Sequence, residues 1–141
     1  MGVIIGIDFG KKRIGLAHTD PNQMIASGLC TLPTPNVIEY LGDYMNHTPI
    51  DKFVVGQPKQ MDGKYSAVEN DILKFITELQ NNFESIPVFR QDERFTSKIA
   101  IKSLIESGAN KKTLKDKALV DQISATLILQ SFLESISKTV I

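Results

Sequence analysis

The sequence contains few of the side chains that cross-link a chain or bind zinc. Its 141 residues include one cysteine, Cys30, and two histidines, His18 and His47. One cysteine excludes an internal disulfide, and these side chains cannot make up a zinc site of the Cys/His type. We therefore expect a protein of the reducing cytoplasm whose fold depends on a hydrophobic core.

Long apolar runs and net charge are missing as well. No apolar run approaches the roughly 20 residues that a membrane helix needs, and no export signal is visible, so we expect no membrane partner. Sixteen basic and sixteen acidic residues cancel, which argues against a polycation that coats nucleic acid through bulk attraction. With 42% apolar residues, the chain 1–141 fits a single α/β domain.

The charges that are present are unevenly distributed. Residues 94–117 carry seven bases and two acids, although the whole chain is neutral. These bases are Arg94, Lys98, Lys102, Lys111, Lys112, Lys115 and Lys117. A basic segment of this kind could follow a nucleic-acid backbone through its phosphates.

Apolar periodicity and turn residues predict strands and helices in alternation. Three short strands come first, at Val3–Asp8, Arg13–Thr19 and 26–32, and their short connections predict an antiparallel meander. The later elements are a helix at Val37–Met45, a buried strand at 53–56, a helix at 67–83, a strand at 86–89, and helices at 96–108 and 117–137. Right-handed crossovers place the later strands beside the first one. The α/β order thus predicts a five-stranded mixed sheet with helices on both faces, an RNase H-like pattern that actin-type ATPases share in outline.

Two local signals refine these elements. Ser66 and Glu69 have the spacing of a capping box, which predicts that Ser66 caps the helix 67–83. Pro87 cannot donate a backbone hydrogen bond, so the strand 86–89 is predicted to lie at an edge of the sheet.

Asp8 stands at the carboxyl end of the predicted central strand. It follows a largely apolar run, and ligand crevices in open α/β sheets form at such strand ends. In the ordinary alternative, Asp8 only begins the tight turn through Phe9 and Gly10, because aspartate is common at such turns. Taken alone, Asp8 does not decide between the two.

Asp121 lies on the apolar side of the last predicted helix. It shares a helical stripe with Ala125, Ile128 and Phe132, so its carboxylate is expected to point toward the sheet. Burying an unpaired carboxylate is costly. The alternative is an acid that the helix macrodipole favours near the helix start, but this does not explain the stripe.

Asp92 and Glu93 close the last predicted strand, where an acid pair is often only a salt-bridge partner. If the strand 53–56 separates this strand from the first, the gap to Asp8 is about 9–10 Å, and a glutamate spans it better than an aspartate. We therefore choose Glu93 over Asp92 as the third acid of the site.

Asp8, Glu93 and Asp121 would form a carboxylate cluster without cysteine or histidine ligands. Such a cluster suits Mg²⁺ or Mn²⁺, which prefer oxygen ligands. Two ions about 3.5–4 Å apart would activate a water molecule and stabilise the leaving oxygen of a phosphodiester. The three acids are therefore candidate metal ligands and catalytic residues of a nuclease.

Basic and polar side chains surround this predicted site. The turn after Asp8 would alone be a solvated hairpin tip, but beside carboxylates its bases would hold backbone phosphates. The helix at 96–108 could attract phosphate at its N-terminus. The candidate nucleic-acid ligands are Lys11, Lys12, Arg13, Arg94, Thr96, Ser97, Lys98, Lys111 and Lys112. The loop 56–63 is expected to face the substrate.

Four blocks of sequence carry a family resemblance. They are Gly6-Ile7-Asp8-Phe9-Gly10 with Lys12-Arg13-Ile14-Gly15, Val55-Gly56-Gln57-Pro58 with Met61-Asp62-Gly63, Asp92-Glu93-Arg94-Phe95-Thr96-Ser97, and Asp121-Gln122-Ile123-Ser124-Ala125 with Ile128-Leu129. Together they resemble the YqgF family of pre-16S rRNA nucleases, which are also described as Holliday-junction-resolvase-like. The blocks span nearly the whole chain in the family's order. The departures avoid the acids: Gln57 and Phe95 stand where leucine is usual, and Ser124 stands where alanine is usual.

The resemblance implies an RNase H-like fold with acids at Asp8, Glu93 and Asp121. It also implies a cytoplasmic role in maturing the 5′ end of 16S rRNA, with the ribosome or its precursor particles as partners. Precursor rRNA is favoured over branched DNA as substrate. The cut could be endo- or exonucleolytic, and the protein could be a monomer or a homodimer.

Two other functions compete with a nuclease. The turn Ile7-Asp8-Phe9-Gly10 followed by Gly15 resembles the phosphate-binding hairpin of actin-type ATPases, although these need two duplicated subdomains and a much longer chain. A non-catalytic nucleic-acid-binding protein could keep the fold without the chemistry. The three acids argue against that loss.

Overall fold

The chain folds around a mixed sheet, described by a computed structural model over residues 2–59, 62–93 and 117–139. The sheet has five strands in the order β3-β2-β1-β4-β5. The strands are β1 (Val3–Asp8), β2 (Arg13–Thr19), β3 (Ala26–Pro33), β4 (Ile50–Gln57) and β5 (Val88–Asp92). The first three form the predicted antiparallel meander, and β4 and β5 run parallel to β1. The predicted α/β fold class is confirmed.

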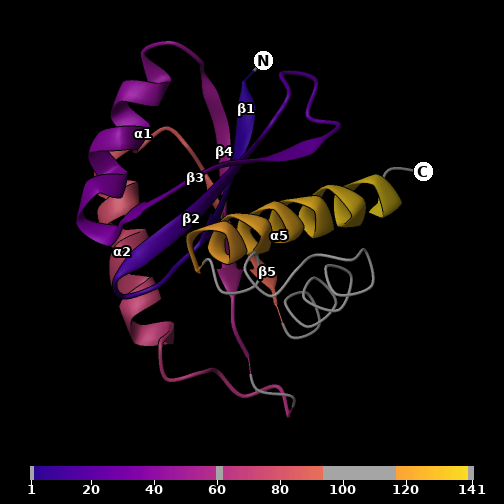
Figure 1. Ribbon diagram of the computed structural model, residues 1–141. Helices are drawn as coiled ribbons and strands as arrows, with labels where there is room; N and C mark the ends of the chain where they lie inside the picture. The colour runs from indigo at the N-terminus through magenta and orange to yellow at the C-terminus, as the bar shows by residue number, and fades with distance from the viewer. Residues whose placement is uncertain (1, 60–61, 94–116, 140–141) are drawn as a thin grey trace.

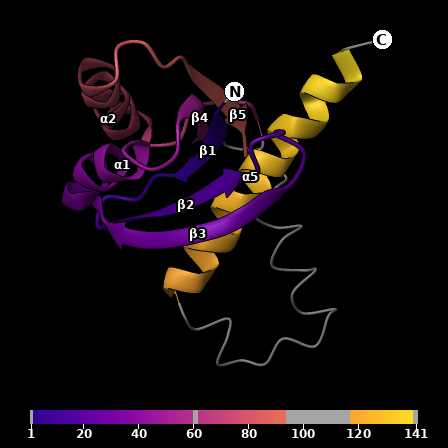
Figure 2. The same cartoon turned by 90° about the horizontal axis from the view of Figure 1, so that it is seen from above.

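The helices cover both faces of this sheet (Figures 1 and 2). One face carries the short 3₁₀ helix η1 (Thr34–Asn36), α1 (Val37–Met45) and α2 (Glu69–Asn82). The helix α5 (Lys117–Thr139) crosses the other face. Side chains of a strand alternate between faces. The alternation places Ile5 and Ile7 in the core under α1 and α2, whereas Ile4 packs against α5. Asp8 follows Ile4 by four residues, so the same alternation places its side chain on the α5 face.

The backbone of α5 approaches the sheet closely because glycines lie beneath it. A Cβ added at Gly6 would lie 2.8 Å from Cβ of Leu129, and one added at Gly15 would overlap the carbonyl oxygen of Asp121. Gly15 pairs with Asp8 in the register of β1 and β2. The missing side chain at Gly15 thus lets the first turns of α5 lie directly beside the end of β1.

The last strand is an edge strand, as Pro87 predicted, but it begins later than expected. Its bounds are Val88–Asp92 and not 86–89. The Pro87 carbonyl already accepts a hydrogen bond from the Phe53 N–H at 3.0 Å, while Ile86 is buried just before the strand. The strand ends at Asp92, and Glu93 follows it directly.

The predicted capping box at the start of α2 does not form. The helix begins at Glu69, and the Ser66 hydroxyl oxygen accepts a hydrogen bond from the Val68 N–H at 3.3 Å. The Glu69 side chain turns away from Ser66 and pairs with Arg90. This pairing explains the difference, because a buried carboxylate gains more from a guanidinium than from one backbone N–H.

Several predicted features lie outside the described residues. These are the helix 96–108 and the side chains of Arg94, Thr96, Ser97, Lys98, Lys102, Lys111, Lys112 and Lys115. The last helix begins at Lys117 as predicted and ends slightly later, at Thr139. No helix within the described part of the chain has the length and apolar character needed to cross a membrane.

Candidate active site

Asp8 ends β1 in a half-buried position on the α5 face of the sheet. Burial raises the pKa of its carboxyl group to about 8, and the charges of Glu93 and Asp121 act in the same direction. Its side chain also hydrogen-bonds to that of Glu93. A carboxyl group in this environment retains its proton at neutral pH unless a cation replaces it.

Glu93 reaches Asp8 from β5 by extending over Gly56 of β4. A Cβ added at Gly56 would lie 2.6 Å from Cδ of Glu93, so the carboxyl group occupies the space that a side chain would fill. The Glu93 N–H donates to the Gln57 carbonyl at 3.1 Å, which fixes the backbone after the strand. Burial raises the pKa of Glu93 to about 7, although the charge of Arg90 opposes this rise. Asp8 and Glu93 therefore form a carboxyl pair that shares a proton.

The alternation along β5 separates Asp92 from Glu93. Phe89 stacks against Phe132 of α5 with ring centroids 5.5 Å apart, whereas Arg90 binds Glu69 of α2. Continued alternation turns Asp92 toward the α2 side and Glu93 toward α5. Glu93 is thus the acid that shares a face with Asp8.

Asp121 lies in the first turns of α5, beside Gly15. The stripe predicted from the sequence is present, since Ala125, Ile128 and Phe132 are all buried. The charge of Asp121 acts on Asp8, but its carboxylate oxygen Oδ2 accepts a hydrogen bond from Nε of Arg13. The structure therefore brings the three predicted acids to one corner of the sheet, with Asp121 engaged by a base.

The chemistry of these side chains fits a hard divalent cation. Their donors are carboxylate oxygens, and a cation could take the place of the proton that Asp8 and Glu93 share. Among residues 2–59, 62–93 and 117–139, however, no three acids, histidines or cysteines are grouped closely enough to hold a metal ion. Asp8 and Glu93 converge, and Asp121 is directed to Arg13.

Comparison with known proteins places the chain in a family. Residues 2–135 match the family model RuvX, described as Holliday junction resolvase. The chain belongs to this family. A relative from Parabacteroides distasonis is 50% identical over 135 residues, which cover 96% of each chain. A relative from Christiangramia forsetii is 48% identical over 133 residues, which cover 94% of this chain and 98% of the relative. Both bear the name "Putative pre-16S rRNA nuclease", so the resemblance to the YqgF family is confirmed.

Solved structures support the fold of this family member. The RuvC protein of T. thermophilus, in complex with a Holliday junction substrate, superposes with a TM-score of 0.54 over 96% of both chains. A second structure of the Thermus thermophilus protein gives 0.53. Sequence identity is only 14% and 16%. The likeness therefore shows the RNase H-like fold alone.

An ion pair that the sequence interpretation missed joins β5 to α2 on the face of the sheet opposite to Asp8 and Glu93. Nη2 of Arg90 donates to Oε1 of Glu69 at 2.7 Å, and Nη1 donates to Oε2 at 3.1 Å. Arg90 also donates to the carbonyl oxygens of Val55 and Gly56 at 3.3 and 3.0 Å. Gln57 completes the network with a 3.2 Å hydrogen bond to Glu69. Strand alternation counted from Phe89 could have placed Arg90 on the α2 face.

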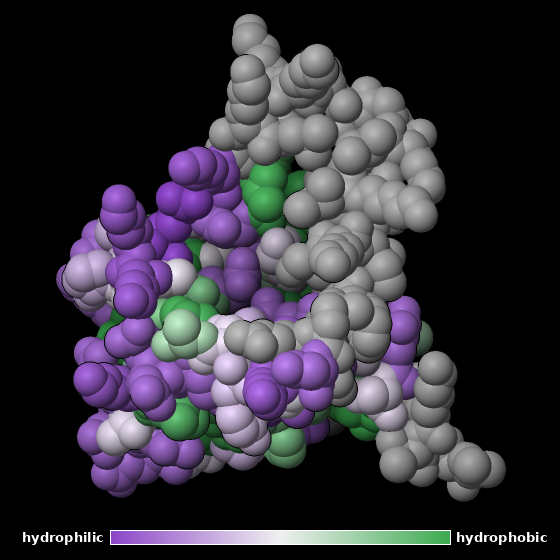
Figure 3. Space-filling view, turned by 90° about the horizontal axis from the view of Figure 1, so that it is seen from below, coloured by the Kyte–Doolittle hydropathy of each residue, from purple (hydrophilic) through white to green (hydrophobic). Residues whose placement is uncertain are grey.

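The basic turn after β1 is divided among different partners. Lys11 forms a 3.5 Å ion pair with Asp71 of α2, and its side chain is 73% exposed. Lys12 is exposed, and Arg13 binds Asp121. Figure 3 views the molecule from the end of the sheet that carries this turn, where most of the described surface is hydrophilic. The turn therefore presents exposed positive charge next to the acids.

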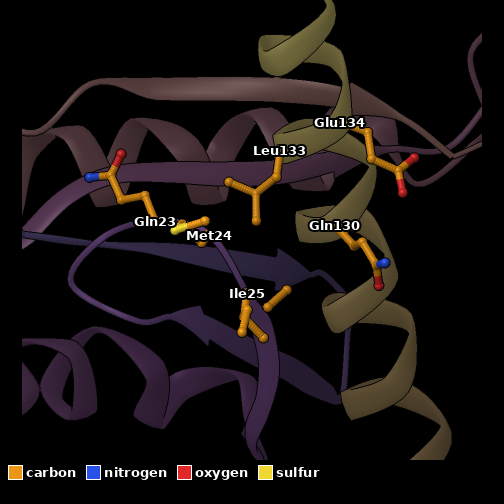
Figure 4. A pocket seen from close by; sticks show the side chains of 7 residues that line it. Gln23, Met24, Ile25, Gln130, Leu133 and Glu134 are labelled. Atoms are coloured by element: carbon orange, nitrogen blue, oxygen red, sulfur yellow. The ribbon is translucent and has the colours of Figure 1, made fainter.

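A separate cavity is lined by side chains of the β2–β3 loop and of α5 (Figure 4). It has a volume of about 420 Å³ between the β2–β3 loop and the C-terminal half of α5. Its lining includes Met24, Ile25, Leu133 and a single acid, Glu134. At about 1.5 Å per residue, Leu133 lies roughly 18 Å along the helix from Asp121. This cavity is not part of the acidic site.

Proposed function

We propose that this protein is a divalent-metal-dependent nuclease that hydrolyses phosphodiester bonds. The observation that carries the proposal is the half-buried carboxyl pair of Asp8 and Glu93, with Asp121 close enough to act on it electrostatically. Burying neighbouring carboxylates is costly unless a cation compensates them. A nuclease of the RNase H-like fold has use for such a cation at the end of its central strand.

Asp8, Glu93 and Asp121 would hold Mg²⁺ or Mn²⁺. In a two-ion arrangement, the bound metal would activate a water molecule and stabilise the leaving oxygen. The chain's own residues have separate tasks. Asp8 and Glu93 bind and orient the cation, Arg90 fixes the strand ends beneath them, and Lys12 attracts the flanking phosphates. The predicted ligands between 94 and 112 would extend this phosphate-binding track.

The proposed substrate is the precursor of 16S rRNA, cut during maturation of its 5′ end in the cytoplasm. Support comes from relatives that bear the name of a pre-16S rRNA nuclease and are 42–50% identical over nearly the whole chain. The precursor particles of the ribosome are the corresponding partners. An actin-type ATPase has less support, because the family model described as Holliday junction resolvase matches residues 2–135, which include all three acids.

A four-way DNA junction is the second candidate substrate. The matching family model is described as Holliday junction resolvase, and the RuvC structure with the same fold is a complex with such a junction. The acid pair would perform the same phosphodiester chemistry on either backbone. The two substrates differ in shape and not in the reaction.

One experiment tests these proposals together. Purified protein is incubated with precursor 16S rRNA and with a four-way DNA junction, each with Mn²⁺ or with EDTA. We expect metal-dependent cleavage of the precursor, loss of cleavage in Asp8→Asn, and normal cleavage in Asp43→Asn. Asp43 is an exposed acid of α1 on the other face of the sheet, which makes it a matched control.

The outcomes separate the alternatives. Cleavage of the junction alone would replace the rRNA proposal with the resolvase proposal. In a separate ATP-binding assay, saturable binding of ATP by a protein that cleaves neither substrate would contradict both. Equal cleavage by wild type and Asp8→Asn would remove Asp8 from the catalytic residues.

A further inference from the structure

Arg13 and Asp121 form an ion pair beside the acid pair of Asp8 and Glu93. Nε of Arg13 donates to Oδ2 of Asp121, and the two residues come from β2 and α5. Both side chains are partly accessible, with 37% of Arg13 and 23% of Asp121 exposed. The pair is therefore neither sealed in the core nor loosely placed on the surface.

This ion pair competes with the proposed role of Asp121. The Asp121 charge acts on Asp8, so the carboxylate lies near the acid pair, yet its oxygen is directed to the guanidinium. A divalent cation beside Asp8 would be repelled by a guanidinium on the same carboxylate. Asp121 therefore cannot give its full charge to the metal while Arg13 holds it.

We propose that Arg13 is a positioning residue that keeps Asp121 away from the metal until the guanidinium is released. The inference rests on the proposed function, since it requires a cation at Asp8 and Glu93. In this arrangement Asp8, Glu93 and Asp121, all among the described residues, are not grouped closely enough to hold a metal ion together. Release of Arg13 completes the site.

The position of Arg13 explains how release occurs. It is the first residue of β2 and follows the exposed turn residues Lys11 and Lys12, where a nucleic-acid backbone would arrive. A guanidinium binds phosphate oxygens with the same planar geometry that it uses for a carboxylate. A substrate phosphate can thus take Arg13 in exchange for Asp121, which makes completion of the metal site dependent on substrate.

The test is a Mn²⁺ titration without nucleic acid, in which electron paramagnetic resonance measures free Mn²⁺. The variants are Arg13→Gln, which removes the ion pair, and Arg13→Lys, which keeps the charge but loses the planar group. Lys12→Gln is the control, because it removes an exposed neighbouring positive charge and leaves the ion pair of Arg13 and Asp121 in place. Thermal unfolding of each variant shows whether it is folded.

We expect Arg13→Gln to bind Mn²⁺ about tenfold more tightly than wild type, which corresponds to about 1.4 kcal/mol. Arg13→Lys should fall between the two, and Lys12→Gln should differ from wild type by less than about threefold. Equal or weaker Mn²⁺ binding by Arg13→Gln would overturn the inference, because Arg13 would then orient Asp121 for the metal. If Arg13→Gln does not fold, Arg13→Lys replaces it in the test, and equal or weaker Mn²⁺ binding by Arg13→Lys would overturn the inference.

This result is distinguishable from failure of the proposed function. If neither wild type nor Arg13→Gln binds Mn²⁺, the result would contradict the metal-dependent nuclease and the inference together. Binding and cleavage by wild type, without tighter binding by Arg13→Gln, would leave the nuclease in place and overturn only the role of Arg13.

Discussion

Glu93 and Asp8 meet above Gly56, the residue of the intervening strand whose missing side chain gives the glutamate its path. Asp8 ends β1 and Glu93 follows β5, and these two strands do not pair with each other because β4 lies between them. Cδ of Glu93 lies only 2.6 Å from the position that a Cβ of Gly56 would occupy. The geometry of the acid pair thus depends on a residue that has no chemistry of its own.

Gly56→Ala should therefore separate activity from stability. The added methyl group would lie 2.6 Å from Cδ of Glu93 and 2.7 Å from Cδ1 of Ile128, both ends of flexible side chains that can move aside. We expect cleavage to fall at least about tenfold as Glu93 is displaced, with stability reduced by about 1–2 kcal/mol. Nuclease assays and urea unfolding measure the two effects.

Gly42→Ala is the matched control for that substitution. A Cβ at Gly42 in α1 would meet no atom within 4 Å, so the change should be neutral or stabilise by about 0.5–1 kcal/mol. Activity should be unchanged. Full activity in Gly56→Ala would show that cleavage does not depend on the position of Glu93 beside Asp8.

Asp8→Asn should stabilise the metal-free protein in a pH-dependent way. The pKa of Asp8 rises on folding from 3.8 to about 8, so the fold favours the protonated form. The contribution of Asp8 to stability is fully present below about pH 4 and is lost as the pH rises through about 8. Asparagine does not titrate. The free energy of unfolding of the variant should therefore exceed that of wild type by more at pH 8.5 than at pH 5. Between these two pH values the excess should grow by on the order of 1–3 kcal/mol.

Urea unfolding in EDTA at pH 5, 7 and 8.5 measures this difference. Asp43→Asn, at an exposed position of α1, is the control for the substitution itself. Addition of Mg²⁺ should stabilise wild type more than Asp8→Asn, because the cation takes the place of the shared proton. A difference between the two proteins that does not vary with pH would contradict the pKa of about 8 for Asp8.

Much of this arrangement follows from sequence patterns that have a direct structural meaning. The largely apolar run before Asp8 predicted β1 with Asp8 at its end, and the helical stripe placed Asp121 on the inner side of α5. The limited reach of an aspartate across two strand spacings favoured Glu93 over Asp92. The first two are patterns within one strand or one helix that can be read along the chain, and the third follows from the spacing of neighbouring strands.

Pairings between distant segments could not be predicted in the same way. The spacing of Ser66 and Glu69 indicated a capping box, but Glu69 binds Arg90 of β5, a partner that only the sheet order brings near. Arg13 was predicted to hold phosphate, and its ion pair with Asp121 depends on how closely α5 approaches Gly15. Local signals do not contain this information, because it arises from packing.

The pair of Arg90 and Glu69 should contribute strongly to stability. Only 20% of the Arg90 side chain and 10% of the Glu69 side chain are exposed, and the contact is bidentate. Arg90→Gln should cost about 2–4 kcal/mol, because Glu69 would be left without its partner in a buried position. Loss of the Arg90 charge should also raise the pKa of Glu93, since burial would then act with less opposition.

Urea unfolding of Arg90→Gln measures the stability, and NMR titration of the Glu93 carboxyl carbon measures its pKa. Lys11→Gln is the control, because it breaks the exposed pair with Asp71 and should cost less than about 1 kcal/mol. If Arg90→Gln and Lys11→Gln lose the same free energy of unfolding, the burial of an ion pair does not determine its contribution to stability here.

Gly15→Ala should damage the site through the backbone of α5. The added methyl group would overlap the carbonyl oxygen of Asp121, which belongs to the helix and cannot rotate away as a side chain can. The start of α5 must then shift from the sheet, carrying Asp121 away from Asp8. We expect a loss of at least about 2 kcal/mol in urea unfolding together with reduced cleavage. In contrast to Gly56→Ala, activity and stability should fall together, and a stable but inactive Gly15→Ala would show that the helix adjusts without leaving the sheet.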